Sequence, residues 1–132
     1  MKNLLLLFLA AVVLTACSAY LTRVDFDDSL NAYNQALRWH EWDKASSYAA
    51  DAIHEEFRAR AAAARDVRVT DFRIVGENYN AEKRQATAEV EIDYYSVFSY
   101  TMKTLRDTQR WMYVDEKGIR GWRLESLPPE FR

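Results

Sequence analysis

The hydrophobic period of this sequence changes once, near Arg65, and that change limits the possible folds more than any other feature. Residues 27–75 contain no glycine or proline, the two residue types that most often interrupt regular structure. Apolar side chains recur there every three or four residues up to Ala64, which is the period of an amphipathic helix. After Arg65 they recur at every second residue, as in a strand with one buried face. The change predicts helices first and a β-sheet second.

Two or three helices are expected between about residues 28 and 64. Asp-Asp-Ser at residues 27–29 supplies the polar side chains that favour a helix N-cap. Apolar residues then follow at helical spacing, and a second apolar register begins near Trp42, so we expect a bend at residues 40–43. The first apolar stripe consists of Leu30, Tyr33, Leu37 and His40.

The second half of the chain has the alternation of four strands separated by short, turn-compatible segments. Short connections between consecutive strands predict an antiparallel meander. Pro128 and Pro129 end the sheet, because proline cannot donate a hydrogen bond to a strand ladder. We expect one face of the sheet in water and the other covered by the helices. The expected strands are residues 67–75, 85–97, 102–114 and 121–126.

Complementary side chains indicate how the strands pair, because a slip of one residue turns every side chain to the other face. We centre the second hairpin between Ser99 and Tyr100, and the first on Ala81. On the wet face this register sets Asp93 opposite Arg106, Glu91 opposite Thr108 and Glu89 opposite Arg110. On the covered face it sets Ala88 opposite Trp111, Ala86 opposite Tyr113, Tyr94 opposite Leu105, Phe72 opposite Val90 and Ile74 opposite Ala88. The fourth strand then adds Trp122 and Leu124 beside Trp111 and Gln109.

The N-terminal segment has the pattern of a secretory signal. Residues 4–14 form an unbroken apolar run that is too short for a spanning helix, which needs about 20 residues. The run also lacks the polar face of a core helix. Lys2 precedes it, and the small residues Thr15 and Ala16 follow it, as in a signal peptide.

The end of this segment, Leu-Thr-Ala-Cys at residues 14–17, resembles the lipobox of bacterial lipoproteins. The resemblance covers residues 1–18 and implies that Cys17 carries a diacylglycerol, that the chain is cut before Cys17, and that the new amino terminus is acylated. Ser18 follows the cysteine, and the sorting rule of that family then implies export to the outer membrane. The alternative is an ordinary signal peptide with a chance cysteine.

The chain is therefore expected to have three parts: a signal peptide at 1–16, a lipidated tether at 17–27 and one α+β domain at 28–132. Two or more acyl chains would make a stable anchor without a spanning helix. With Cys17, the sole cysteine, lipidated, no disulfide forms within the chain. Loss of Lys2 leaves 17 basic and 20 acidic residues, a net charge of −3, which argues against nucleic acid as a partner.

Asp107 and Gln109 are the most informative polar residues, because the register turns both toward the apolar side of the sheet. Buried polar groups must be hydrogen-bonded or must line a cavity. A carboxylate and an amide between aromatic walls suit a small-ligand pocket. The alternative is a shifted register or a bulge that places both side chains in water. The candidate pocket residues are Asp107, Gln109, Tyr94, Tyr113, Trp111 and, at the rim, His40.

The other polar groups have simpler interpretations. The carboxylate row Glu89, Glu91 and Asp93 is expected to be a solvated, salt-bridged face. His40 and His54 lack the close helical spacing of a zinc pair, so we expect no metal and no cofactor. A basic cluster lies near the junction of the helices and the sheet and is interpreted as a solvated helix end, or as a contact for anionic headgroups or a cell-wall polymer. The cluster consists of Arg58, Arg60, Arg65 and Arg68.

The order of elements over residues 28–126 resembles the NTF2-like or cystatin-like α+β roll, in which a curved sheet wraps helices. The sequence QRWMYVDEKGIRGWRLES at 109–126 also resembles the closing hairpin of such domains. That resemblance implies either an enzyme with a pocket Asp, His or Tyr, or a non-catalytic secretion or envelope module, and fold alone does not decide between them.

Two functional hypotheses follow. The first is a non-catalytic, periplasm-facing outer-membrane lipoprotein that binds an envelope protein or a cell-wall component. Its basis is the anchor, the short tether and a sequence without a catalytic motif. The second is a small-ligand-binding or enzymatic domain centred on Asp107 and Gln109.

Overall fold

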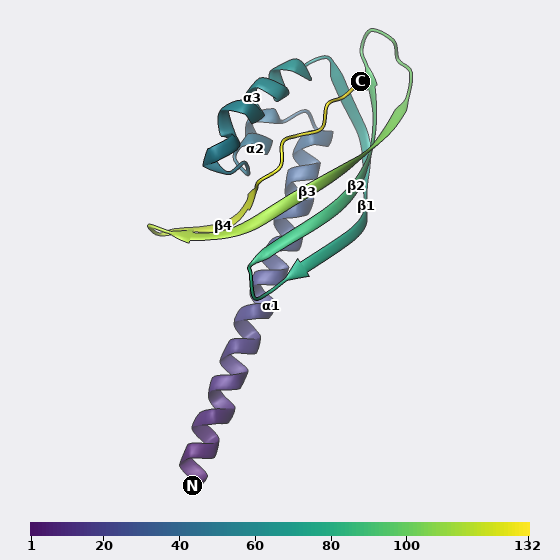
Figure 1. The fold of residues 1–132 in the computed structure, drawn as a ribbon. Helices are drawn as coiled ribbons and strands as arrows, with labels where there is room; N and C mark the ends of the chain where they lie inside the picture. The colour runs from purple at the N-terminus through teal and green to yellow at the C-terminus, as the bar shows by residue number, and fades with distance from the viewer.

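The protein combines a helical layer with one antiparallel sheet, and this confirms the α+β class (Figure 1). The computed structural model describes residues 1–132, except for the side chains of Thr15, Cys17, Ser18 and Ala19. The four strands lie in the order β1-β2-β3-β4. The helical elements are α1 (Lys2–Arg38), α2 (Trp42–Ser46), η1 (Asp51–Ile53) and α3 (His54–Ala63). The strands are β1 (Val67–Asn80), β2 (Gln85–Ser96), β3 (Lys103–Glu116) and β4 (Ile119–Leu124).

Helix α1 is longer than the sequence pattern predicts, because it continues through residues 27–29 instead of starting there. The predicted N-cap is therefore wrong: nothing upstream breaks the helix, and these residues lie inside it. The predicted bend at 40–43 is confirmed. His40 has a φ of 59°, and the Glu41 amide donates to the Ala36 carbonyl at 2.8 Å. This turn ends α1 and starts α2.

The residues expected to form a tether are part of α1 in the structure. Phe26 is fully buried in the core, and the indole Nε1 of Trp122 donates to the Thr22 carbonyl at 3.1 Å. Packing of the domain therefore begins at least as early as Thr22, upstream of the boundary predicted at Asp28. Among the described residues, no helix is both long and apolar enough to cross a membrane.

The side-chain faces of the sheet are as predicted, but the pairings within each hairpin are wrong by about two residues. The second hairpin pairs Asp93 with Thr104, Glu91 with Arg106, Glu89 with Thr108, Ala88 with Gln109, Ala86 with Trp111 and Tyr94 with Lys103. The first pairs Phe72 with Ile92 and Ile74 with Val90, and the third pairs Trp111 with Leu124 and Tyr113 with Trp122. A slip of two residues keeps every side chain on its face, so the alternation could not reveal it.

Two irregularities lie in β1, between Val69 and Asp71 and between Ile74 and Gly76. Such bulges bend an edge strand and increase its twist, and Figure 1 shows the sheet curving around α1. The core lies between the sheet and α1, where the apolar stripe of the helix meets the inward face of the sheet. Its largest side chains are Trp111, Trp122, Tyr33, Phe26, Phe57, Leu30 and Leu37.

Candidate functional site

Asp107 and Gln109 both point from β3 into the protein, as one of the two sequence-based alternatives predicted. Asp107 is 6% exposed and Gln109 is 1% exposed. The burial of β3 alternates around them, with Arg106, Thr108 and Arg110 in water. The alternative that places both side chains in solvent is therefore wrong, since the two-residue slip does not change their face.

Asn34 of α1 completes this buried polar group, and sequence reasoning missed it. Gln109 Nε2 donates to Asn34 Oδ1 at 2.9 Å, and Asn34 Nδ2 donates to Gln109 Oε1 at 3.1 Å. Asn34 Nδ2 also donates to the Leu30 carbonyl at 2.9 Å. The paired amides join α1 to β3. Asn34 lies one turn after Leu30 on the apolar face of α1, and that position was a usable signal.

Asp107 is held in this group through its neighbour on the same strand. Gln109 Nε2 donates to Asp107 Oδ2 at 3.0 Å, and none of the ion pairs among described residues includes Asp107. Burial raises the pKa of Asp107 to about 6, the Gln109 hydrogen bond lowers it, and Glu89 raises it further. Desolvation thus exceeds the single hydrogen bond. The Asp107 carboxyl group changes charge close to neutral pH.

Two buried donors near this group have no hydrogen-bond partner among the described residues: the Tyr33 hydroxyl and the Trp111 indole Nε1. Their rings meet edge to face, with centroids 5.6 Å apart. Burial, and then the charge of Asp107, raise the pKa of Tyr33 well above its usual value. An unpartnered buried donor costs free energy, so the Tyr33 hydroxyl and the Trp111 indole N–H are both held in the core at a cost to stability.

The structure does not gather all six predicted pocket residues in one place. Asp107, Gln109 and Trp111 project from the same face of β3, beside Tyr33 and Asn34 of α1. The other three predicted residues are engaged in separate contacts, as follows.

Tyr94 donates its hydroxyl to the Arg132 carbonyl at 2.7 Å, and its ring lies 5.0 Å from that of Phe131. Tyr113 packs on Trp122 with ring centroids 5.6 Å apart. His40 Nδ1 accepts from Trp42 Nε1 at 3.2 Å, and burial and then the charge of Arg68 lower its pKa.

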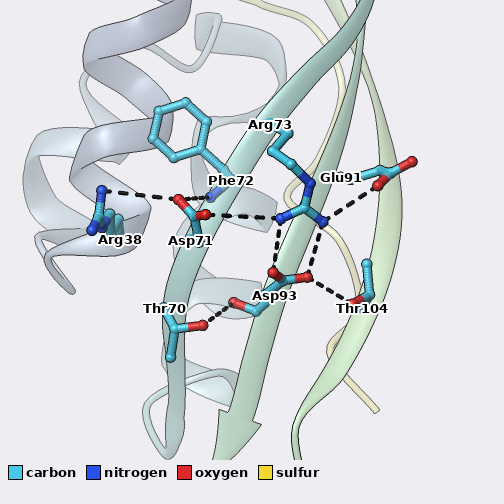
Figure 2. Close-up of polar contacts among 8 residues, drawn as sticks. All are labelled: Arg38, Thr70, Asp71, Phe72, Arg73, Glu91, Asp93 and Thr104. Carbon is cyan, nitrogen blue, oxygen red and sulfur yellow. Dashed lines mark hydrogen bonds and ion pairs between the residues drawn. The ribbon is translucent and has the colours of Figure 1, made fainter.

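The outer face of the sheet carries a network of ion pairs, as the carboxylate row predicted (Figure 2). Arg73 donates to both carboxylate oxygens of Asp93, at 2.8 and 3.1 Å, and to Glu91 at 3.3 Å. Arg106 donates to Glu91 at 2.9 Å, and Thr104 Oγ1 to Asp93 at 2.6 Å. Arg73 and then Thr104 hold the pKa of Asp93 at about 2. These carboxylates stay ionised at neutral pH and serve as structural charges.

The basic residues near the junction of α3 and β1 have contacts of their own. Arg60 donates to the Pro128 carbonyl at 3.0 Å and pairs with Glu130 at 3.3 Å. Arg68 donates to the carbonyl of Arg65 at 2.8 Å. These contacts tie the arginines to nearby backbone and carboxylates.

The turn between β2 and β3 exposes a group of large apolar side chains that we call the hairpin tip: Phe98, Tyr100 and Met102. Phe98 is 81% exposed and Tyr100 is 73% exposed. The tip is ordered by local contacts: the Tyr100 amide donates to the Ser96 carbonyl at 2.9 Å, and the Tyr100 ring stacks on Tyr95 with centroids 5.8 Å apart. Tyr100 has a φ of 54°, a conformation that is uncommon for a bulky residue.

No protein-family model matches this chain, and neither does any curated protein. Two solved structures have a similar fold, and both are SEC-C motif containing proteins. The solution structure from Rhodopseudomonas palustris is 10% identical with a TM-score of 0.55, over 70% of this chain and 69% of that one. The crystal structure from Psychrobacter arcticus is 12% identical with a TM-score of 0.56, over 69% of this chain and 52% of that one. This chain spans about half of the second protein, and the likeness concerns the fold alone.

Proposed function

We propose that this protein is a lipid-anchored lipoprotein of the bacterial outer membrane that faces the periplasm. Its α+β domain acts as a non-catalytic binding or assembly module of the cell envelope. The single observation that supports this best is the hairpin tip, which lies at the end of the domain away from the N-terminal half of α1 (Figure 1). An anchor at one end leaves a binding surface free at the other.

The hairpin tip has the chemistry of a protein-binding surface. Aromatic residues and methionine are enriched in the cores of protein interfaces, and Phe98, Tyr100 and Met102 are all exposed. Tyr100 also keeps a left-handed backbone that asparagine or glycine would adopt at lower cost. Tyr100 therefore combines a bulky, exposed side chain with a backbone conformation that is unfavourable for it. This combination fits a role in recognition better than a role in folding.

The anchor rests on the lipobox resemblance at Cys17, whose side chain lies outside the described residues. We expect wild-type protein made in a bacterial host to incorporate radiolabelled palmitate and to fractionate with the outer membrane. Cys17→Ala removes the only thiol, so the label should be lost completely. Palmitate on the variant, or none on the wild type, would contradict the proposed anchor.

The tip is tested by separating binding from stability. We expect Tyr100→Asn to fold at least as stably as wild type, because asparagine tolerates a positive φ. In intact cells, a photo-crosslinking residue at position 98 should give a discrete cross-linked product. Adding Tyr100→Asn to the same protein should remove most of that product. Protease treatment shows whether that product contains a second protein, and its mass then identifies the partner.

Ile119, the first residue of β4, is a matched control, because it is also apolar and exposed. A cross-linker there should give no comparable product. Equal products from positions 98 and 119, or a product insensitive to Tyr100→Asn, would refute recognition by the hairpin tip.

The second function, a small-ligand site, is supported by the unpartnered buried donors of Tyr33 and Trp111 and by the buried carboxyl group of Asp107. A small polar ligand, buried there, would accept from both and bond to the carboxyl group. Thermal-shift screening with small polar molecules tests this function. A ligand of this site should raise the melting temperature of wild type but not that of Asp107→Asn.

A further inference from the structure

We propose that the lipid-proximal end of the domain rests against the headgroup layer of the bilayer and holds the hairpin tip away from the membrane. This inference depends on the proposed lipidation of Cys17. The lipid-proximal end consists of the α1 residues Tyr20, Leu21 and Val24 together with the β1–β2 turn at residues 81–84. Its partner is the lipid surface itself.

The distance between the anchor and the domain is very short. Only four residues separate Cys17 from Thr22, and Thr22 is bonded to the buried Trp122. As part of α1, the step from Cys17 to Thr22 advances about 8 Å along the helix axis. The polar layer of one leaflet is about 5–8 Å thick. The domain therefore begins where the headgroups end.

Contacts beside Thr22 hold this part of α1 firmly against the sheet. The guanidinium of Arg23 lies 4.9 Å from the ring centroid of Tyr79 in β1. Arg23 Nη2 also lies 3.5 Å from Glu77 Oε2 on the same strand. Since α1 and β1 are joined here, the β1–β2 turn is carried along with the helix. The anchored segment thus determines which end of the sheet is nearest to the lipid.

The lipid-proximal end has side chains that suit an interface. Tyr20 is 69% exposed and Leu21 is 61% exposed, and Val24 lies one turn from Tyr20 on the same face of α1. An aromatic and aliphatic face on a helix binds at the boundary between headgroups and acyl chains. The β1–β2 turn adds the exposed polar residues Glu82, Lys83 and Arg84, which are compatible with hydrated headgroups.

The two hairpins are far enough apart for a clear test. Strand β2 connects the two turns and has 12 residues, so their ends are separated by about 36 Å. Figure 1 shows the β1–β2 turn beside the middle of α1, where the N-terminal half of the helix leaves the sheet, and the β2–β3 turn at the other end. An upright domain therefore presents one turn to the lipid and the other to the aqueous phase.

The experiment uses the lipidated full chain in phospholipid vesicles that contain headgroup-nitroxide lipid as a quencher. Lipidation consumes the native thiol, so Lys83→Cys and Ser99→Cys each provide a single site for a fluorescent label. We expect several-fold stronger quenching at position 83 than at position 99. Leu21→Asp should reduce quenching at position 83, because it removes an apolar contact with the interface.

A flexible Gly/Ser insertion after Ala19 is the control, since a long linker allows the domain to leave the surface. It should lower quenching at position 83 toward the value at position 99. Equal quenching of both labels in the uninserted protein, or stronger quenching at position 99, would overturn the proposed orientation. Failure of the proposed anchor is distinguishable, because an unlipidated protein would not float with the vesicles at all.

Discussion

Asp107→Asn should stabilise the protein at pH 8 by about 3 kcal/mol, because the wild type holds an ionised carboxylate in its core. Burial raises the pKa of Asp107 from the usual value of 3.8 to about 6, so the folded state binds this proton more tightly than the unfolded state. Asparagine has nearly the same shape, and its Oδ1 can still accept from Gln109 Nε2. The change removes the buried charge and keeps the hydrogen bond.

The same carboxyl group determines the direction of the pH dependence. Between pH of about 4 and 6 the folded protein keeps a proton that the unfolded chain has lost, so the contribution of Asp107 to stability falls as pH rises. Above pH of about 6 the penalty is constant. Urea unfolding at pH 4 and pH 8 should show a gain from Asp107→Asn at pH 8 that is much smaller at pH 4.

Asp93→Asn is the matched control on the opposite face of the sheet. The pKa of Asp93 is lowered from 3.8 to about 2, mainly by Arg73. Its charge therefore stabilises the folded state at neutral pH, and this contribution is lost as pH falls from 3.8 to about 2. This variant should lose stability at pH 8 where Asp107→Asn gains it. If Asp107→Asn has the stability and the pH profile of wild type, Asp107 is in water in the folded protein.

Trp122→Ala should destabilise the folded protein by about 3–5 kcal/mol, because it empties the centre of an aromatic cluster. The Trp122 ring is buried against Phe26 at 5.0 Å, Tyr113 at 5.6 Å and Tyr79 at 5.9 Å between centroids. Truncation leaves a large cavity where α1, β1 and β4 meet. Urea unfolding should show the loss as a lower midpoint at similar slope.

Trp122→Phe separates packing from the hydrogen bond to Thr22. It keeps most of the ring contacts but removes the indole N–H that donates to the Thr22 carbonyl, a bond worth about 1 kcal/mol. We expect a loss well below that of Trp122→Ala, and faster hydrogen exchange of amides near Thr22 in α1. Trp39→Ala is the control, because Trp39 is exposed and should change stability by less than about 0.5 kcal/mol. Similar losses for Trp122→Ala and Trp39→Ala would contradict the described core.

The sequence pattern identified the class of fold and the face of each side chain because both depend on local periodicity. A period near 3.6 up to Ala64 and a period of two afterwards are properties of neighbouring residues. The inward direction of Asp107 and Gln109 follows from the same alternation, and so does the outward row of carboxylates. These features required no knowledge of distant contacts. The lipobox resemblance at residues 14–17, on which the proposed anchor rests, is equally local.

Only the tertiary structure decided which residues meet. The turn of the second hairpin is centred between Phe98 and Ser99, one residue before the predicted centre. That difference moves every opposite residue by two positions without changing any face. The hydrogen bonds between Asn34 and Gln109 and the ring contact between Tyr33 and Trp111 join residues more than 70 positions apart. Such contacts depend on how the curved sheet packs on α1, and no local pattern in the sequence records that packing.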